Sequence, residues 1–122
     1  MEDGLIIDDN RNTADALQQM LKILDLDARV AYGSSPAITL LGKTTPGFIC
    51  LDINMPGVDG TEVLSYIRRE PHLKKVPVVV ITSDDQAETR QQVMQGGAQV
   101  MLIKPVTIDV LEGGLKKAGI IK

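Results

Sequence analysis

The sequence predicts an α/β protein, a doubly wound three-layer sandwich built around a five-stranded parallel sheet. Five short apolar segments alternate along the 122 residues with five segments of helical character. Four of the apolar segments are continuous runs, which is typical of strands buried on both faces of a parallel sheet. Right-handed connections between such strands place helices on both faces of the sheet.

The predicted strands are short and bounded by polar, glycine or proline residues. The second one alternates, with Val30 on one face and Arg29 on the other, so we expect it nearer an edge of the sheet. Pro77 has no amide hydrogen and therefore belongs near the start of the fourth strand. The five predicted strands are 4–7, 28–32, 48–51, 76–81 and 100–103.

The predicted helices begin at capping residues and end at glycine or proline. Asn12 or Thr13 is expected to cap the first helix, and Ser35 to cap the second, with Pro36 at the first helical position. Gly113-Gly114 interrupts the last helix. Because each glycine costs about 1 kcal/mol relative to alanine, we expect that helix to be short, bent or frayed. The predicted helices are 13–24, 35–43, 61–69, 86–95 and a last one from 107.

The composition limits the classes of function. Hydrophobic residues make up 43% and charged residues 24%, and a net charge of −3 argues against a dedicated nucleic-acid surface. We find no apolar run that could span a bilayer and no signal-peptide pattern, so we expect a cytoplasmic protein without membrane contact. The single cysteine, Cys50, is expected to be a buried, inert thiol, and with His72 as the single histidine a zinc site is not expected.

Residues with reactive side chains follow four of the predicted strands: Asp8-Asp9, Asp52, Thr82 and Lys104. Taken singly, each is more often a solvated loop or cap residue. In a parallel sheet, however, the carboxyl ends of all strands lie at one edge, where open α/β sheets bind ligands. If the first and third strands are neighbours, three carboxylates meet there.

Three carboxylates at one place repel one another unless a cation joins them, and an all-oxygen site suits Mg²⁺ or Mn²⁺. Thr82 and Lys104 then supply a hydroxyl and an ammonium group that can hold an anion above the metal, such as a phosphoryl group. Asp52 ends its strand below a rigid loop that contains Pro56 and Gly57. It is the best-placed nucleophile, because a carboxylate can form an acyl phosphate.

The order and spacing of these residues resemble the receiver domain of two-component response regulators. The resemblance covers essentially the whole chain and implies a flavodoxin-like sheet of order 2-1-3-4-5, with Asp52 as the phosphoacceptor. The motifs that carry it are Asp8-Asp9, Asp52-x-x-Met55-Pro56-x-x-Asp59-Gly60, Thr82-Ser83 and Gly97-Ala98 followed after five residues by Lys104-Pro105.

The resemblance also implies roles for the other site residues. Asp9, Asp52 and the backbone carbonyl of Asn54 would bind Mg²⁺ or Mn²⁺, with Asp8 acting partly through water. Lys104 would pair with the phosphoryl group, and the Lys104–Pro105 bond would be cis. Thr82 would be the switch hydroxyl that moves to the phosphoryl oxygen. The side chains of Asn54 and Asp84 lie where the family tunes the rate of dephosphorylation.

Three features depart from the family pattern, and all fall on the face formed by the fourth helix, fifth strand and fifth helix. Met101 replaces the usual tyrosine or phenylalanine, the segment 97–100 lacks the usual acid after Gly-Ala, and the last helix contains Gly113-Gly114. Since the family uses this face for output and dimerisation, the resemblance predicts the phosphorylation chemistry and leaves the output mode open. Met101 has many rotamers and is expected to couple weakly to phosphorylation.

The resulting interpretation is a single receiver domain, residues 1–122. It accepts a phosphoryl group from a sensor histidine kinase or a histidine phosphotransfer protein and catalyses only its own phosphorylation and dephosphorylation. It signals to a downstream protein through the face just described, without contacting nucleic acid. We expect a monomer or a phosphorylation-dependent dimer.

Other interpretations remain open at this point. An aspartyl-phosphate phosphatase usually has a second acid two residues after the nucleophile, where this chain has Asn54. A flavin-binding electron carrier of the same fold needs a phosphate-binding loop after the first strand, where Asp8-Asp9-Asn10 would repel a phosphate. A third alternative is a receiver excised from a larger DNA-binding regulator or a hybrid kinase.

Overall fold

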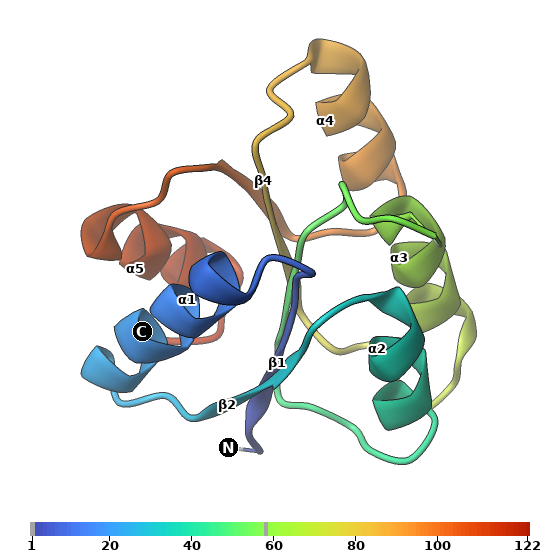
Figure 1. Ribbon diagram of the computed structural model, residues 1–122, viewed down its shortest axis with the longest axis horizontal. Helices are drawn as coiled ribbons and strands as arrows, with labels where there is room; N and C mark the ends of the chain where they lie inside the picture. Colours follow the sequence, from blue (N-terminus) through green and yellow to red (C-terminus); the bar gives the residue numbers. More distant parts are fainter. Residues whose placement is uncertain (1, 58) are drawn as a thin grey trace.

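Five parallel strands form one sheet in the order β2-β1-β3-β4-β5, as predicted. The computed structural model describes residues 2–57 and 59–122. The strands run side by side through the middle of the molecule (Figure 1). Their bounds are β1 Gly4–Ile7, β2 Ala28–Ala31, β3 Ile49–Leu51, β4 Val78–Thr82 and β5 Val100–Ile103.

The helices cover both faces of this sheet. In Figure 1, α1 and α5 lie on one side of the strands, and α2, α3 and α4 lie on the other. The three-layer arrangement predicted from the alternating pattern is therefore confirmed. The helices are α1 Arg11–Ile23, α2 Ser34–Leu41, α3 Gly60–Arg69, α4 Ala87–Gln95 and α5 Ile108–Lys117.

Each face of the sheet has its own hydrophobic core. Ile6 and Cys50 belong to the core beneath α1 and α5, whereas their neighbours Ile7 and Leu51 belong to the core beneath α2, α3 and α4. This alternation follows from the two-residue period of a strand. It explains why the strands read as continuous apolar runs. The edge position of β2 is also as predicted, and Arg29 is exposed there.

The starts of the first two helices differ from the prediction. Asn10 caps α1, its side chain accepting from Thr13 N at 3.0 Å, so neither Asn12 nor Thr13 is the cap. The residue before α2 is Gly33, with φ of 131°, and Pro36 occupies the third helical position. The predicted cap of α2 was wrong because this φ, which favours glycine, turns the chain into α2 two residues earlier than the Ser-Pro signal indicates.

The last helix is continuous over ten residues, so the predicted interruption at Gly113-Gly114 was wrong. Thr107 caps it as expected, accepting from Val110 N at 3.2 Å. A Cβ at Gly114 would lie 2.8 Å from Leu102 Cδ1, so this glycine lets α5 approach β5 closely. Packing against β5 therefore outweighs the low helix propensity of the glycine pair.

In the part of the chain that the structure describes, no helix combines the length and the apolar character that crossing a bilayer requires.

Candidate active site at the carboxyl edge of the sheet

Two aspartates are brought together by the pairing of β1 with β3. Ile7 lies beside Leu51 in this pair, so Asp8 and Asp52, which follow them, leave the sheet side by side. The amide nitrogen of Asp52 donates to the carbonyl oxygen of Ile7 at 2.9 Å. Both aspartates are buried, with 3% and 6% of their surface exposed. Such burial is unusual for a carboxylate without a partner.

Lys104, which follows β5, bridges the two buried carboxylates. Its Nζ donates to Asp8 Oδ2 at 2.9 Å and to Asp52 Oδ2 at 3.0 Å. The other oxygen of each carboxylate accepts a backbone amide: Asp8 Oδ1 from Asn10 N at 2.9 Å, and Asp52 Oδ1 from Asn54 N at 3.0 Å. Each carboxylate is therefore fixed by one ammonium and one amide group.

The charges of this group influence one another. Burial raises the pKa of the Asp52 carboxyl, and Asp8 adds to this, while the Asn54 amide and Lys104 act in the opposite direction. For Lys104, burial disfavours the charged form, but the hydrogen bonds and charges of Asp8 and Asp52 outweigh it, so its pKa is raised. Lys104 is therefore held as a cation between the two acids.

Asp9 joins this group and completes a set of three carboxylates. One oxygen from each of Asp8, Asp9 and Asp52 lies within 4.8 Å of the others. Asp9 is exposed, so the set opens to solvent on its side. Carboxylate oxygens are the donors that hard divalent cations prefer, and Mg²⁺ commonly keeps several of its waters at such sites. The donor set thus fits the metal predicted from the sequence.

The comparisons with known proteins agree with this geometry. The family model described as "Response regulator receiver domain" matches residues 5–116. The chain is 31% identical over 114 residues to the chemotaxis protein CheY-3 of Vibrio cholerae, covering 93% of this chain and 88% of the relative. The chain belongs to the response regulator receiver family.

Other relatives and structures place the match in context. The chain is 32% identical over 114 residues to the C4-dicarboxylate transport transcriptional regulatory protein DctD of Pseudomonas aeruginosa, but it spans 24% of that relative's length. The solved structure of the chemotaxis response regulator CheY4 of Vibrio cholerae has a TM-score of 0.89 at 24% identity and covers 97% of this chain and 98% of its own. This likeness confirms the flavodoxin-like fold. Receiver domains of two-component regulators accept a phosphoryl group on an aspartate, and this is the function of the family to which the chain belongs.

Thr82 of this receiver is the last residue of β4 and is fully buried. Its Oγ1 accepts from the side-chain amide of Asn54 and from the backbone amide of Asp84, each at 3.3 Å. Its carbonyl oxygen accepts from Lys104 N at 2.8 Å. The following peptide bond, Lys104–Pro105, is cis, as the resemblance implied. Thr82 is therefore in direct contact with three other residues of the predicted site, Asn54, Asp84 and Lys104.

The carboxylate of Asp84 is engaged with α4. Its Oδ1 accepts from Gln86 N at 3.0 Å and its Oδ2 accepts from Thr89 Oγ1 at 2.8 Å. Thr89 was not singled out in the sequence, because it lies on a polar helix and its partner depends on how the backbone turns between β4 and α4. The spacing from Asp84 to Thr89 carries no motif that would have indicated the contact.

Met101 is buried in the core beneath α2, α3 and α4, with 5% of its surface exposed. It lies beside Val80, which precedes Thr82 by two positions in β4. The side chain therefore already occupies the interior of the protein.

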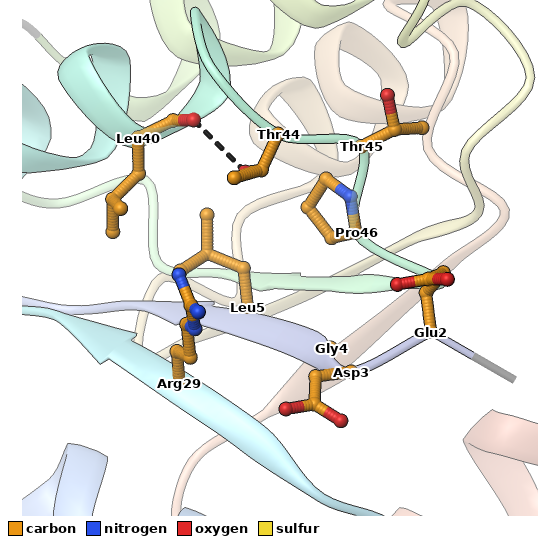
Figure 2. Close-up of a pocket in the computed structure, with 9 residues that line it drawn as sticks. All are labelled: Glu2, Asp3, Gly4, Leu5, Arg29, Leu40, Thr44, Thr45 and Pro46. Atoms are coloured by element: carbon orange, nitrogen blue, oxygen red, sulfur yellow. Dashed lines mark hydrogen bonds between the residues drawn. The ribbon is translucent and has the colours of Figure 1, made fainter.

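A hollow of about 400 Å³ lies near the amino ends of strands β1 and β2, opposite the candidate site. Figure 2 shows Arg29 of β2 and Leu5 of β1 on one side of it, with Leu40 and Thr44 above and the Thr44 hydroxyl donating to the Leu40 carbonyl at 2.9 Å. Gly4 and Leu5 line it, and they begin β1, whereas Asp8 follows the end of that strand. The hollow is therefore separate from the candidate site formed by Asp8, Asp9 and Asp52.

Proposed function

We propose that residues 1–122 act as a single receiver domain in which Asp52 is the phosphoacceptor. The observation that carries this proposal is the contact of Lys104 with Asp52 and Asp8, at 3.0 and 2.9 Å, within a set of three carboxylates. Asp52 is the central member, because it touches Lys104 directly and is linked to Thr82 through Asn54.

Asp8, Asp9 and Asp52 would hold Mg²⁺ or Mn²⁺, together with the backbone carbonyl of Asn54. The bound cation would supply charge stabilisation for the transferred phosphoryl group. The support for this assignment is the closeness of the three carboxylates and the exposure of Asp9, which leaves a path for a hydrated ion. Asp8 is buried and tied to Asn10 N and Lys104, which suits an indirect role through water.

In the proposed reaction, an Asp52 oxygen attacks the phosphorus atom of a phosphohistidine on the donor. The new P–O bond forms as the P–N bond of the donor breaks, and the leaving imidazole takes a proton from solvent. Lys104 exchanges its contact with the Asp52 carboxylate for one with the phosphoryl oxygens. A cation in this position stabilises the negative charge on the phosphoryl oxygens of the product.

Thr82 would act as the switch hydroxyl, with Asn54 and Asp84 beside it. Its two present contacts, with Asn54 Nδ2 and Asp84 N, occupy both acceptor positions of the hydroxyl oxygen. A movement of Thr82 towards a phosphorylated Asp52 breaks both contacts, so the change spreads to the loop after β4.

The phosphoryl donor would be a sensor histidine kinase or a histidine phosphotransfer protein, since these proteins donate phosphoryl groups to members of the family. The protein would act as a cytoplasmic signalling domain that turns over no metabolite, and its output would be contact with a downstream protein through the face of α4, β5 and α5. It would be a monomer or dimerise on phosphorylation. The chain spans most of CheY-3 but a quarter of DctD, so receivers with and without large additional regions occur among the relatives.

Incubation with acetyl phosphate tests the assignment of Asp52. We expect a mass increase of one phosphoryl group in the presence of Mg²⁺, none in the presence of EDTA, and none in Asp52→Asn. Asp59→Asn is the matched control, because Asp59 is an exposed acid of the same loop and asparagine also caps a helix. Undiminished labelling of Asp52→Asn would show that another residue is the acceptor.

A further inference from the structure

A chain of hydrogen bonds joins the hydroxyl of Thr82 to the first turn of α4, and it passes through Asp84. The backbone amide of Asp84 donates to Thr82 Oγ1 at 3.3 Å. Its carboxylate accepts from Gln86 N at 3.0 Å and from the Thr89 hydroxyl at 2.8 Å. Asp84 therefore contacts the proposed switch residue with its backbone and α4 with its side chain.

The start of α4 depends on this chain of contacts. Gln86 occupies the position before the helix, but its side chain makes no capping hydrogen bond. The carboxylate of Asp84 instead holds the backbone amide of Gln86 and the side chain of Thr89 in the first turn. Of the nine residues of α4, all of which the structure describes, only Val93 is buried. A helix with so little buried apolar surface is held in place mainly by contacts at its ends. A change in the position of Asp84 is therefore expected to move the first turn of α4.

Met101 is poorly suited to carry a signal to α4. It is already buried in the same core as Val93, so movement of Thr82 gives it no new place to enter. Its flexible side chain can adapt to small changes without a preference for one arrangement. A residue that fits both states equally well shifts no population between them.

We propose that Thr89 is a positioning residue which, through Asp84, couples the position of Thr82 to the first turn of α4. The inference rests on the proposed function, in which Thr82 moves towards a phosphorylated Asp52. That movement takes away the oxygen to which Asp84 N donates. The backbone of Asp84 then rearranges, and its carboxylate carries the change to Gln86 and Thr89.

The same contacts work in the opposite direction. While Thr89 holds the carboxylate of Asp84, it also keeps the Asp84 amide aimed at Thr82 and so opposes the movement of Thr82. Coupling between two sites is reciprocal. Removal of the Thr89 hydroxyl is therefore expected to ease the movement of Thr82 and to tighten binding of a phosphoryl mimic at Asp52.

Beryllofluoride, added with Mg²⁺ and followed by NMR of backbone amides, tests the relay. In Thr89→Val, which keeps the branched shape but lacks the hydroxyl, we expect about fivefold tighter binding of beryllofluoride. The shift changes of residues 87–95 are expected to fall to less than half of those in the wild type, while those of Thr82 persist. Thr89→Ser keeps the hydroxyl and is expected to restore both properties.

Unchanged affinity together with an unchanged α4 response in Thr89→Val would overturn the proposal. So would random-coil amide shifts of residues 87–95 in that variant before beryllofluoride is added, because Thr89 would then be needed only for folding. Met101→Leu, which conserves volume, is expected to respond like the wild type, and loss of its α4 response would place the coupling at position 101. Absence of any shift at Asp52, Asn54 and Thr82 in the wild type would refute the proposed function, and this inference with it.

Discussion

The guanidinium group of Arg68, at the end of α3, donates two hydrogen bonds to the carbonyl oxygen of Gly97, in the turn between α4 and β5. Its Nε and Nη2 donate to this oxygen at 3.0 and 2.8 Å. Its Nη1 donates to the carbonyl oxygen of Val76 at 2.8 Å, and its Nη2 also donates to Gln99 Oε1 at 3.0 Å. Gln99 Oε1 accepts in addition from Val78 N at 2.7 Å. An amide oxygen thus accepts hydrogen bonds in the segment where the family usually has an acid.

Replacement of Arg68 by lysine is expected to destabilise the fold. A lysine ammonium cannot reproduce the planar fork that serves several carbonyl oxygens, and about 2 kcal/mol of unfolding free energy is expected to be lost. Arg69→Lys is the control, because exposed Arg69 contacts the Ser65 hydroxyl at 3.1 Å and is expected to change stability by less than about 0.5 kcal/mol. Urea unfolding measures both. Equal stability of the two variants would show that the Arg68 contacts are not needed.

The two glycines of α5 are expected to respond to alanine with opposite signs. A Cβ at Gly114 would lie 2.8 Å from Leu102, so Gly114→Ala forces the helix and the strand apart and destabilises by about 1–3 kcal/mol. No described atom lies within 4 Å of a Cβ at Gly113, so Gly113→Ala gains helix propensity and stabilises by about 0.5–1 kcal/mol. Thermal unfolding of the pair tests the close approach of α5 to β5, and a stabilised Gly114→Ala would contradict it.

The buried thiol of Cys50 is expected to make the fold less stable in alkali. Burial raises its pKa from 9.0 to about 12. Between these values the unfolded chain loses the thiol proton while the folded protein keeps it, so the unfolding free energy falls as pH rises. Between pH 8 and pH 10 this loss amounts to about 1.4 kcal/mol. Comparison with Cys50→Ala at each pH isolates the contribution, since lysines and tyrosines titrate in both proteins. Identical pH dependence would show that the thiol ionises equally in both states.

Mg²⁺ is expected to stabilise the fold through Asp9. At a concentration ten times the dissociation constant, the increase in unfolding free energy is about 1.4 kcal/mol. Asp9→Asn is expected to lose most of this increase, and to be more stable than the wild type without metal, because one of three mutually repelling charges is gone. Asp85→Asn, an exposed acid outside the set, is expected to behave like the wild type. Equal stabilisation of wild type and Asp9→Asn by Mg²⁺ would remove Asp9 from the metal site.

The layers and the strand positions were predictable from the sequence because β1, β3 and β4 are buried on both faces, between two apolar layers. Successive residues of a strand point to opposite faces of the sheet. A short run that is apolar at every position therefore indicates a strand buried on both faces, as in a parallel sheet. The helix boundaries were less predictable. The start of α2 depends on the φ of Gly33, and the continuity of α5 depends on the packing of Gly114 against Leu102. Glycine permits the φ of Gly33 but does not require it, and the contact of α5 with β5 is a tertiary one, so neither follows from the local sequence alone.

The candidate site was predictable to a similar extent. Asp8, Asp9, Asp52 and Lys104 meet because the strands that carry them end at one edge, which the strand pattern alone indicates. The contacts around Asp84 were not predictable. A carboxylate in a loop can cap a helix or face a neighbouring site, and the choice made here depends on the turn that brings Thr89 within 2.8 Å of it.

The ion pair between Lys104 and Asp8 joins residues that are 96 positions apart in the chain. The ion pair between Lys104 and Asp52 joins residues 52 positions apart. A domain generally folds as one unit, so Asp8, Asp52 and Lys104 take up these positions together, once the chain has been made past β5. In the proposed assignment, a ribosome-bound chain that stops before Lys104 contains the acceptor carboxylate but lacks the cation that would stabilise the phosphoryl group. Phosphorylation of Asp52, as proposed above, would therefore require that β5 has docked, and a phosphoryl donor that meets a half-made chain would find no complete site.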